Sequence, residues 1–141
     1  MNKLVHVDVS KIIEGVIPVL ESREEVVGAY LFGSILGACR PDSDIDIGLL
    51  LNPDISYSEK ELERIQEEVL EELPAQNNRV FDLVILNNYS DIFKYKVITE
   101  GKLIYARDQD IITDFIEIVS RRRAENYPRY REALEIIARG E

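Results

Sequence analysis

Two short strand-forming segments, joined by a loop, constrain the fold of this chain more than any other feature. The first, residues 26–32, is an apolar run rich in β-forming residues that stops at Gly33-Ser34. The second, residues 45–49, alternates apolar side chains with Asp46 and Gly48, which is the period of a strand. The loop between them is tight at residues 40–43, so the start of the second strand is expected to return beside Gly33-Ser34.

The rest of the chain predicts helices around one sheet. A capping box formed by Ser58 and Glu61 begins a helix over 59–73 that Pro74 ends. The order of all expected elements predicts one sheet backed by helices on one side, in a single α+β domain over residues 1–141 with a C-terminal helical segment at about 109–139. The other expected elements are a helix over 12–20 with Asp8 and Ser10 as possible caps, a strand over 80–86, a helix from Ser90 to Gly101, a short strand over 103–105, and a helix from about 110 to 138 bent near Pro128.

Composition narrows the functional classes. A net charge of −10 and a pI near 4.7 repel phosphate backbones, so sequence-independent nucleic-acid binding is disfavoured. A divalent cation, a basic partner or solubility alone would explain the acidity. Cys39 and His6 are the only residues of their types, which excludes a disulfide framework and a cysteine zinc site and disfavours a Ser-His or Cys-His catalytic pair. No membrane span or signal-peptide pattern is present, so a cytoplasmic location is expected.

Two aspartates open the second strand. Asp44 and Asp46 are two residues apart, so their side chains point to the same face of the strand, about 7 Å apart along the backbone. Neighbouring carboxylates repel each other and are costly to bury without a countercharge. A divalent cation such as Mg²⁺ removes this difficulty, because it binds one or two carboxylates and completes its octahedron with water and phosphate oxygens. Such a pair on its own is more often a solvated strand face.

A third aspartate and a glycine-serine turn complete the pattern. Asp82 interrupts an apolar strand, and it joins the same cluster if that strand lies beside the second. Three carboxylates would then be able to hold two metal ions. Gly33 permits close approach of a phosphate, and Ser34 adds a hydroxyl donor. Each feature alone has an ordinary structural explanation, such as a strand edge or a cap for Asp82, but their order along the chain is more specific.

These residues resemble a known family. The segment Leu31–Ser34 followed by Arg40–Gly48 is similar to the signature of the DNA polymerase β-like nucleotidyltransferase superfamily. The resemblance implies a mixed sheet with helices on one side. It also implies that Gly33, Ser34 and the motif residue Ser43 bind the triphosphate, that Asp44 and Asp46 bind metal, and that Asp82 is the third carboxylate, which helps to activate the acceptor hydroxyl.

A looser similarity extends over most of the chain. Residues 82–84, residues 98–108 and the arginine-rich, tyrosine-containing C-terminal helix resemble the MntA antitoxin subgroup. The resemblance implies a HEPN-family toxin of the HepT type as partner, ATP as co-substrate, two Mg²⁺ ions, and transfer of AMP to a tyrosine of the toxin.

Two alternatives to this function remain at this point. Related enzymes modify hydroxyls of aminoglycosides, although no separate substrate domain is visible here. Many minimal family members carry an Arg-Gly in the loop after Gly-Ser, whereas this chain has Gly37 and then Arg40, so a non-catalytic antitoxin that acts by binding alone is the other alternative. The basic stretch Arg121–Arg123 with residues 127–131 suits a partner or intramolecular contact, a solvated face, or nucleic acid.

Overall fold

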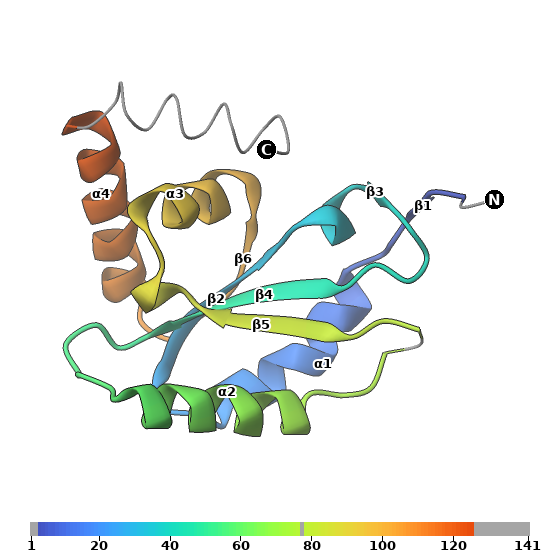
Figure 1. Cartoon of the computed structure of the whole chain (residues 1–141), viewed down its shortest axis with the longest axis horizontal. Coiled ribbons are helices and arrows are strands. Elements are labelled where there is room, and N and C mark those ends of the chain that lie inside the picture. Colours follow the sequence, from blue (N-terminus) through green and yellow to red (C-terminus); the bar gives the residue numbers. More distant parts are fainter. Residues whose placement is uncertain (1–2, 77, 126–141) are drawn as a thin grey trace.

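The core of the molecule is a four-stranded mixed sheet (Figure 1). The computed structural model describes residues 3–76 and 78–125. The strands are β2 (Val26–Phe32), β4 (Ile45–Leu51), β5 (Phe81–Ile85) and β6 (Lys102–Ala106), in the order β5-β4-β2-β6. β4 pairs parallel with β5, and the other pairs are antiparallel. The four strands expected from the sequence are therefore confirmed, as is the mixed sheet.

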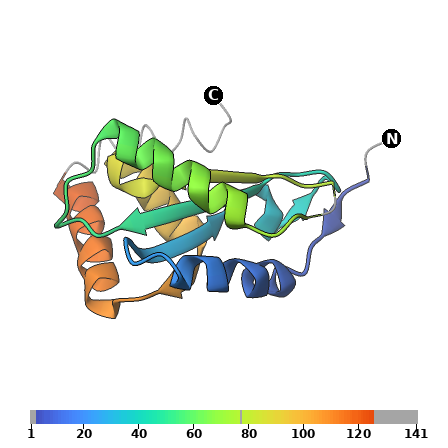
Figure 2. The same cartoon turned by 90° about the horizontal axis from the view of Figure 1, so that it is seen from below.

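Helices cover both faces of this sheet, so the expectation of helices on one side was wrong. Helices α1 (Ser10–Glu21) and α2 (Glu59–Glu72) pack on one face, and α3 (Asp91–Glu100) and α4 (Gln109–Glu125) pack on the other (Figures 1 and 2). The sequence contained a signal for this arrangement. Residues 26–32 and 47–51 are continuously apolar or glycine, and such strands are typical of sheets that are covered on both faces. In the structure, nearly every residue of β2 and β4 is buried.

The alternation along β4 divides the core between the two faces. Ile45, Ile47 and Leu49 belong to the cluster that contains the apolar residues of α1 and α2. Leu50 packs with Ile112 of α4 on the opposite face. The same opposite face carries Asp46, so the polar position expected on this strand lies on the side of α3 and α4, near the end of the sheet where β4 begins.

Local signals set several element boundaries. The capping box is present, with the Glu61 amide donating to Ser58 Oγ at 3.1 Å, and Ser90 caps α3 by accepting from the Phe93 amide at 3.2 Å. Helix α1 begins at Ser10 itself, whose amide donates to the Asp8 carboxylate at 3.1 Å, and it continues through Pro18.

Some elements were not expected from the sequence. Strands β1 (Val5–His6) and β3 (Ala38–Cys39) form a separate two-stranded sheet, and short 3₁₀ helices occupy Ser34–Leu36 (η1) and Leu86–Asn88 (η2). Elements of two or three residues are too short to show a periodic pattern. The expected bend near Pro128 and the basic segment 127–131 lie outside the described residues.

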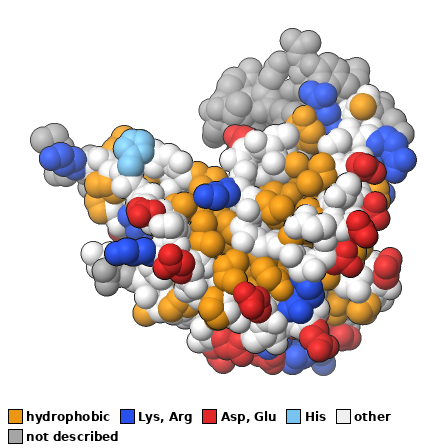
Figure 3. Space-filling model, turned by 180° about the vertical axis from the view of Figure 1, so that it is seen from behind, with side chains coloured by type: hydrophobic (Ala, Val, Ile, Leu, Met, Phe, Trp, Pro, Cys, Tyr) orange, Lys and Arg blue, Asp and Glu red, His pale blue; other side chains and the backbone are white. Residues whose placement is uncertain are grey.

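Acidic side chains are spread over the helical surface as well as at the cluster in the sheet. In the space-filling view from behind, hydrophobic side chains gather in the middle of the face, and acidic side chains gather at its lower edge (Figure 3). Helix α2 is rich in glutamate. Among the described residues, no helix is long and apolar enough to span a bilayer.

One arginine joins the end of β6 to the end of α1. The Arg107 guanidinium donates to the carbonyl oxygens of Glu21 at 2.6 Å and Val26 at 3.2 Å, with longer contacts to those of Leu20 and Arg23. Helix α1 has no basic residue in its last turn. Arg107, more than eighty residues further along the chain, therefore supplies the donors that the last carbonyls of a helix need.

We expect Arg107→Met to lower the free energy of unfolding by about 1–2 kcal/mol, because several carbonyl groups lose a charged donor at once. Urea denaturation monitored by circular dichroism measures this change. Arg64→Met is the matched control, since Arg64 makes only an exposed i,i+4 ion pair with Glu68, and it should leave the stability almost unchanged. Equal effects of the two substitutions would contradict the role of Arg107.

Candidate active site

Three aspartates meet where β4 and β5 begin. Asp46 lies directly beside Asp82 in the parallel register of the two strands, and Asp44 precedes the first residue of β4. The structure therefore brings together all three carboxylates that the sequence singled out. Asp44 and Asp82 are exposed, whereas Asp46 is partly buried.

The electrostatic environment of Asp46 is unfavourable for its charged form. Burial, followed by the charges of Asp82 and Asp44, raises the pKa of Asp46 from 3.8 to about 6. Among the described residues, no salt bridge reaches any of the three carboxylates. Within the described part of the chain, the cluster consequently holds negative charge that no ion pair neutralises.

A glycine with left-handed backbone geometry touches the cluster. Gly33 follows the last residue of β2, Phe32, which pairs with Asp46, and it has a φ angle of +83°. A Cβ atom at this position would collide with Oδ2 of Asp46. Gly33 is therefore required both by its backbone conformation and by the close approach of the Asp46 carboxylate.

A polar hollow of about 330 Å³ opens beside the cluster. The sequence-predicted residues Ser34 and Ser43 both line it, together with Asp44 and Asp46. Arg40, which also lines it, pairs with Asp42 at 3.3 Å. Hydroxyl groups and a guanidinium are suitable donors to phosphate oxygens.

Arg79 is a residue of this region that sequence reasoning missed. Its Nη1 donates to the Ser43 carbonyl at 3.0 Å and to the Arg40 carbonyl at 3.4 Å, which ties the 40–43 loop to the segment before β5. Arg79 lies 36 positions after Ser43 and 39 positions after Arg40, so no local sequence pattern predicts these hydrogen bonds.

A second, larger hollow of about 560 Å³ lies between α3 and the same end of the sheet. Gly33, Ser34 and Asp46 line it on the sheet side. The remaining lining residues are Phe32, Phe93, Lys96, Val97 and Glu100, most of them from α3. Helix α3 was expected from the sequence, but its contribution to the site was not.

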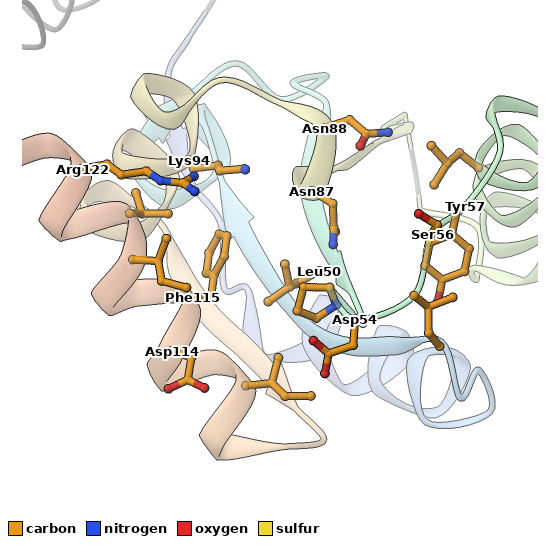
Figure 4. Close-up of a pocket in the computed structure, with 16 residues that line it drawn as sticks. Leu50, Asp54, Ser56, Tyr57, Asn87, Asn88, Lys94, Asp114, Phe115 and Arg122 are labelled. Atoms are coloured by element: carbon orange, nitrogen blue, oxygen red, sulfur yellow. The ribbon is translucent and has the colours of Figure 1, made fainter. Parts of the chain in front are cut away.

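A third hollow, of about 520 Å³, lies at the opposite end of the sheet (Figure 4). Phe115 and Arg122 of α4 and Lys94 of α3 lie on one side, and Ser56 and Tyr57 lie across from them. Leu50, near the last residue of β4, forms part of this hollow, whereas the aspartates lie where β4 begins. It is therefore separate from the carboxylate cluster.

The donor set fits a divalent cation that is shared with a substrate. Asp46 lies beside two other carboxylates, which raise its pKa, and oxygen atoms are the ligands that Mg²⁺ prefers. In the described part of the chain, no group of three or more His, Cys, Asp or Glu side chains is arranged to hold a metal ion. Since Mg²⁺ is usually bound by only one or two carboxylates plus phosphate oxygens, the residues fit an ion that a nucleotide helps to coordinate.

Comparison with known families agrees with this geometry. The family model described as polymerase beta nucleotidyltransferase matches residues 14–110, which include the three aspartates and the Gly33-Ser34 turn. The match covers more than half of the chain. The chain therefore belongs to the polymerase β nucleotidyltransferase family.

Solved structures share the fold. The chain resembles a structure described as the toxin-antitoxin MntA-HepT, with 21% identity, coverage of 88% of this chain and 97% of the other, and a TM-score of 0.55. It resembles equally a complex of MNT antitoxin with a tri-AMPylated Shewanella oneidensis HEPN toxin, with the same identity, coverage and TM-score. It also resembles a toxin-antitoxin structure with AMP-PNP, with 22% identity, coverage of 86% of this chain and 98% of the other, and a TM-score of 0.56. No curated protein sequence matches significantly.

We expect Gly33→Ala to lower the free energy of unfolding by about 1–3 kcal/mol, because alanine disfavours the positive φ angle and its Cβ displaces Asp46. Gly37→Ala is the matched control in the next turn of the chain. Gly37 has an extended backbone, and a Cβ atom there meets nothing within 4 Å. Equal stability of the two variants in urea denaturation would contradict the proposed constraint.

The raised pKa of Asp46 gives stability a defined pH dependence. The folded protein holds the Asp46 proton more tightly than the unfolded chain does, so this group disfavours folding increasingly as pH rises from about 4 to about 6, and fully above that. Without divalent ions, Asp46→Asn should therefore stabilise the protein at pH 8, by on the order of 1 kcal/mol after allowance for partial exposure, and hardly at pH 4. Denaturation of the wild type and of Asp46→Asn at the two pH values measures this difference in stability. Asp54→Asn, at an exposed position, is the control. A difference in stability that does not depend on pH would contradict the raised pKa of Asp46.

Proposed function

We propose that this protein transfers AMP from ATP to a tyrosine hydroxyl of a HEPN-family toxin and thereby acts as its antitoxin. The observation that carries the proposal is the placement of Asp46 beside Asp82 and against Gly33, within a family of nucleotidyltransferases. The likeness in fold to structures described as MntA-HepT, to one with an AMPylated toxin and to one with AMP-PNP supports this choice of donor and acceptor.

The chemistry follows from the positions of the carboxylates. The acceptor oxygen attacks the α-phosphorus of ATP in line, a new phosphorus–oxygen bond forms, and the bond to the bridging oxygen breaks, so that pyrophosphate leaves. Asp82 accepts the proton of the hydroxyl or helps to orient it. Asp44, Asp46 and Asp82 would hold Mg²⁺, two ions in the full complex, which would neutralise charge on the phosphates when bound.

The triphosphate is assigned to the polar hollow. Ser34 and Ser43 line this hollow, where their hydroxyl groups would donate to phosphate oxygens, and Gly33 has no side chain that would hinder the approach of a phosphate. Arg40 lines the same hollow and supplies a positive charge. Within this loop, Ile35 and Cys39 serve packing, since both are buried in the core.

The test is a labelling reaction. The protein is incubated with α-³²P-labelled ATP, Mg²⁺ and the product of the neighbouring reading frame, and label on the partner is measured on a denaturing gel. We expect Asp44→Asn, Asp46→Asn and Asp82→Asn each to reduce labelling by at least about 100-fold, because each removes charge that holds metal or acceptor. Asp54→Asn, at the other end of the sheet, should label the partner like the wild type.

Other outcomes would identify the alternatives. Label on an aminoglycoside, with none on the partner, would replace the protein acceptor with a small molecule. Full protection against the toxin by a folded variant that lacks all three aspartates would show that binding alone neutralises the partner. Removal of Mg²⁺ by EDTA should abolish labelling, and labelling that persists in EDTA would contradict the assigned metal role.

A further inference from the structure

The two hollows beside the aspartates share residues but differ in chemistry. Ser34 and Asp46 line both of them. On one side of this shared edge, the polar hollow contributes hydroxyl groups and Arg40. On the other side, the α3 hollow (the 560 Å³ hollow between α3 and the sheet) contributes two phenylalanines and a buried valine, with one lysine and one glutamate. A nucleotide is divided in a comparable way, into a charged triphosphate and a nucleoside whose base has flat, apolar faces.

We propose that the α3 hollow binds the nucleoside half of the nucleotide donor, with the Phe93 ring as the surface on which the base stacks. The inference rests on the proposed function, because it assumes that the triphosphate occupies the polar hollow. The α-phosphate then lies at the shared edge, next to Asp46. A volume of about 560 Å³ is within the range of about 300–1,000 Å³ that is usual for small-molecule sites.

The Phe93 ring is held in place by its neighbours. It makes an edge-to-face contact with Phe32, with ring centroids 5.7 Å apart, and a tilted contact with Tyr89 at 4.7 Å. Phe32 is the residue that pairs with Asp46 across β2 and β4. The aromatic surface is thus ordered before any ligand arrives and is connected directly to the catalytic end of the sheet, which reduces the entropic cost of binding.

Polar groups are available for the edge of a base or for ribose hydroxyls. Lys96 and Glu100 are four residues apart on α3, so they lie on one face of the helix. Both line the hollow, where they offer a donor and an acceptor. Val97, between them in sequence, is buried and also lines the hollow. Gly33 adds no side chain that would separate the two halves of the site.

The order of the strands argues against the acceptor as occupant. In the order β5-β4-β2-β6, Asp82 of β5 and Phe32 of β2 lie on opposite sides of Asp46. An acceptor that Asp82 activates therefore approaches over β5. The α3 hollow lies on the β2 side, which leaves it for the part of the donor that does not react.

The experiment compares a triphosphate ligand that carries the nucleoside with one that lacks it. Binding of a non-hydrolysable ATP analogue and of inorganic tripolyphosphate, each with Mg²⁺, is measured by calorimetry. Phe93→Ala should lower the affinity for the analogue by about ten-fold or more, since the loss of base–aromatic stacking typically has an effect of that size. The affinity for tripolyphosphate should be unchanged. Phe93→Leu keeps apolar bulk without a flat ring and should show the same selective loss, whereas Phe93→Trp should restore binding.

Tyr95→Ala is the matched control, because it removes an aromatic ring of α3 that packs under Arg123 and does not line the hollow. Thermal unfolding of each variant verifies that it is folded. Unchanged affinity of Phe93→Leu for the analogue, or equal affinity of the wild type for both ligands, would overturn the inference. A higher KM for the acceptor alone in Phe93→Leu would assign the hollow to the acceptor instead. If nucleotide binding depends on Phe93 but no AMP is transferred, the proposed function is contradicted, whereas the assignment of the α3 hollow to the nucleoside is retained.

Discussion

The partial burial of Asp46 beside two other carboxylates, at one end of the sheet, is the constraint on which the rest of the site depends. The parallel pairing of β4 with β5 places Asp46 beside Asp82, and the antiparallel pairing of β4 with β2 places Asp46 beside the end of β2. Burial and the neighbouring charges raise the pKa of Asp46, so the folded protein carries an electrostatic penalty at neutral pH. Such a penalty is tolerated most readily where a ligand removes it, which is why we interpret the cluster as a functional site.

The fold resolves the steric side of the same constraint. β2 ends where the Asp46 carboxylate leaves no space for a Cβ atom, and Gly33 occupies that position. The chain then turns through η1 and returns along the 40–43 loop, which Arg79 fastens to the segment before β5. As a result the two serines and Arg40 line one side of the cluster, while α3 closes the other side.

Many elements and site residues could be predicted because they depend on local sequence patterns. The alternation of 45–49, the capping box at Ser58 and the polar interruption at Asp82 each predicted an element or a site residue that the structure contains. Features that depend on contacts distant in sequence were not predictable in this way. Arg79 and Arg107 act on carbonyls far along the chain, and the contribution of α3 to the site depends on which face of the sheet the helix covers. The expectation of helices on one face of the sheet was wrong, although the continuous apolar runs of β2 and β4 indicated two covered faces.

On this interpretation, the aspartate cluster binds a divalent ion together with a nucleotide. A crystal structure with Mn²⁺ and a non-hydrolysable ATP analogue tests it most directly, because the anomalous signal of manganese locates the ion without assumptions about the ligand. We expect a manganese peak at coordination distance, about 2.0–2.3 Å, from an Asp46 carboxylate oxygen, with phosphate oxygens completing the coordination. A nucleotide bound in the hollow beside Tyr57, or bound beside Ser34 with no metal peak at Asp46, would contradict it.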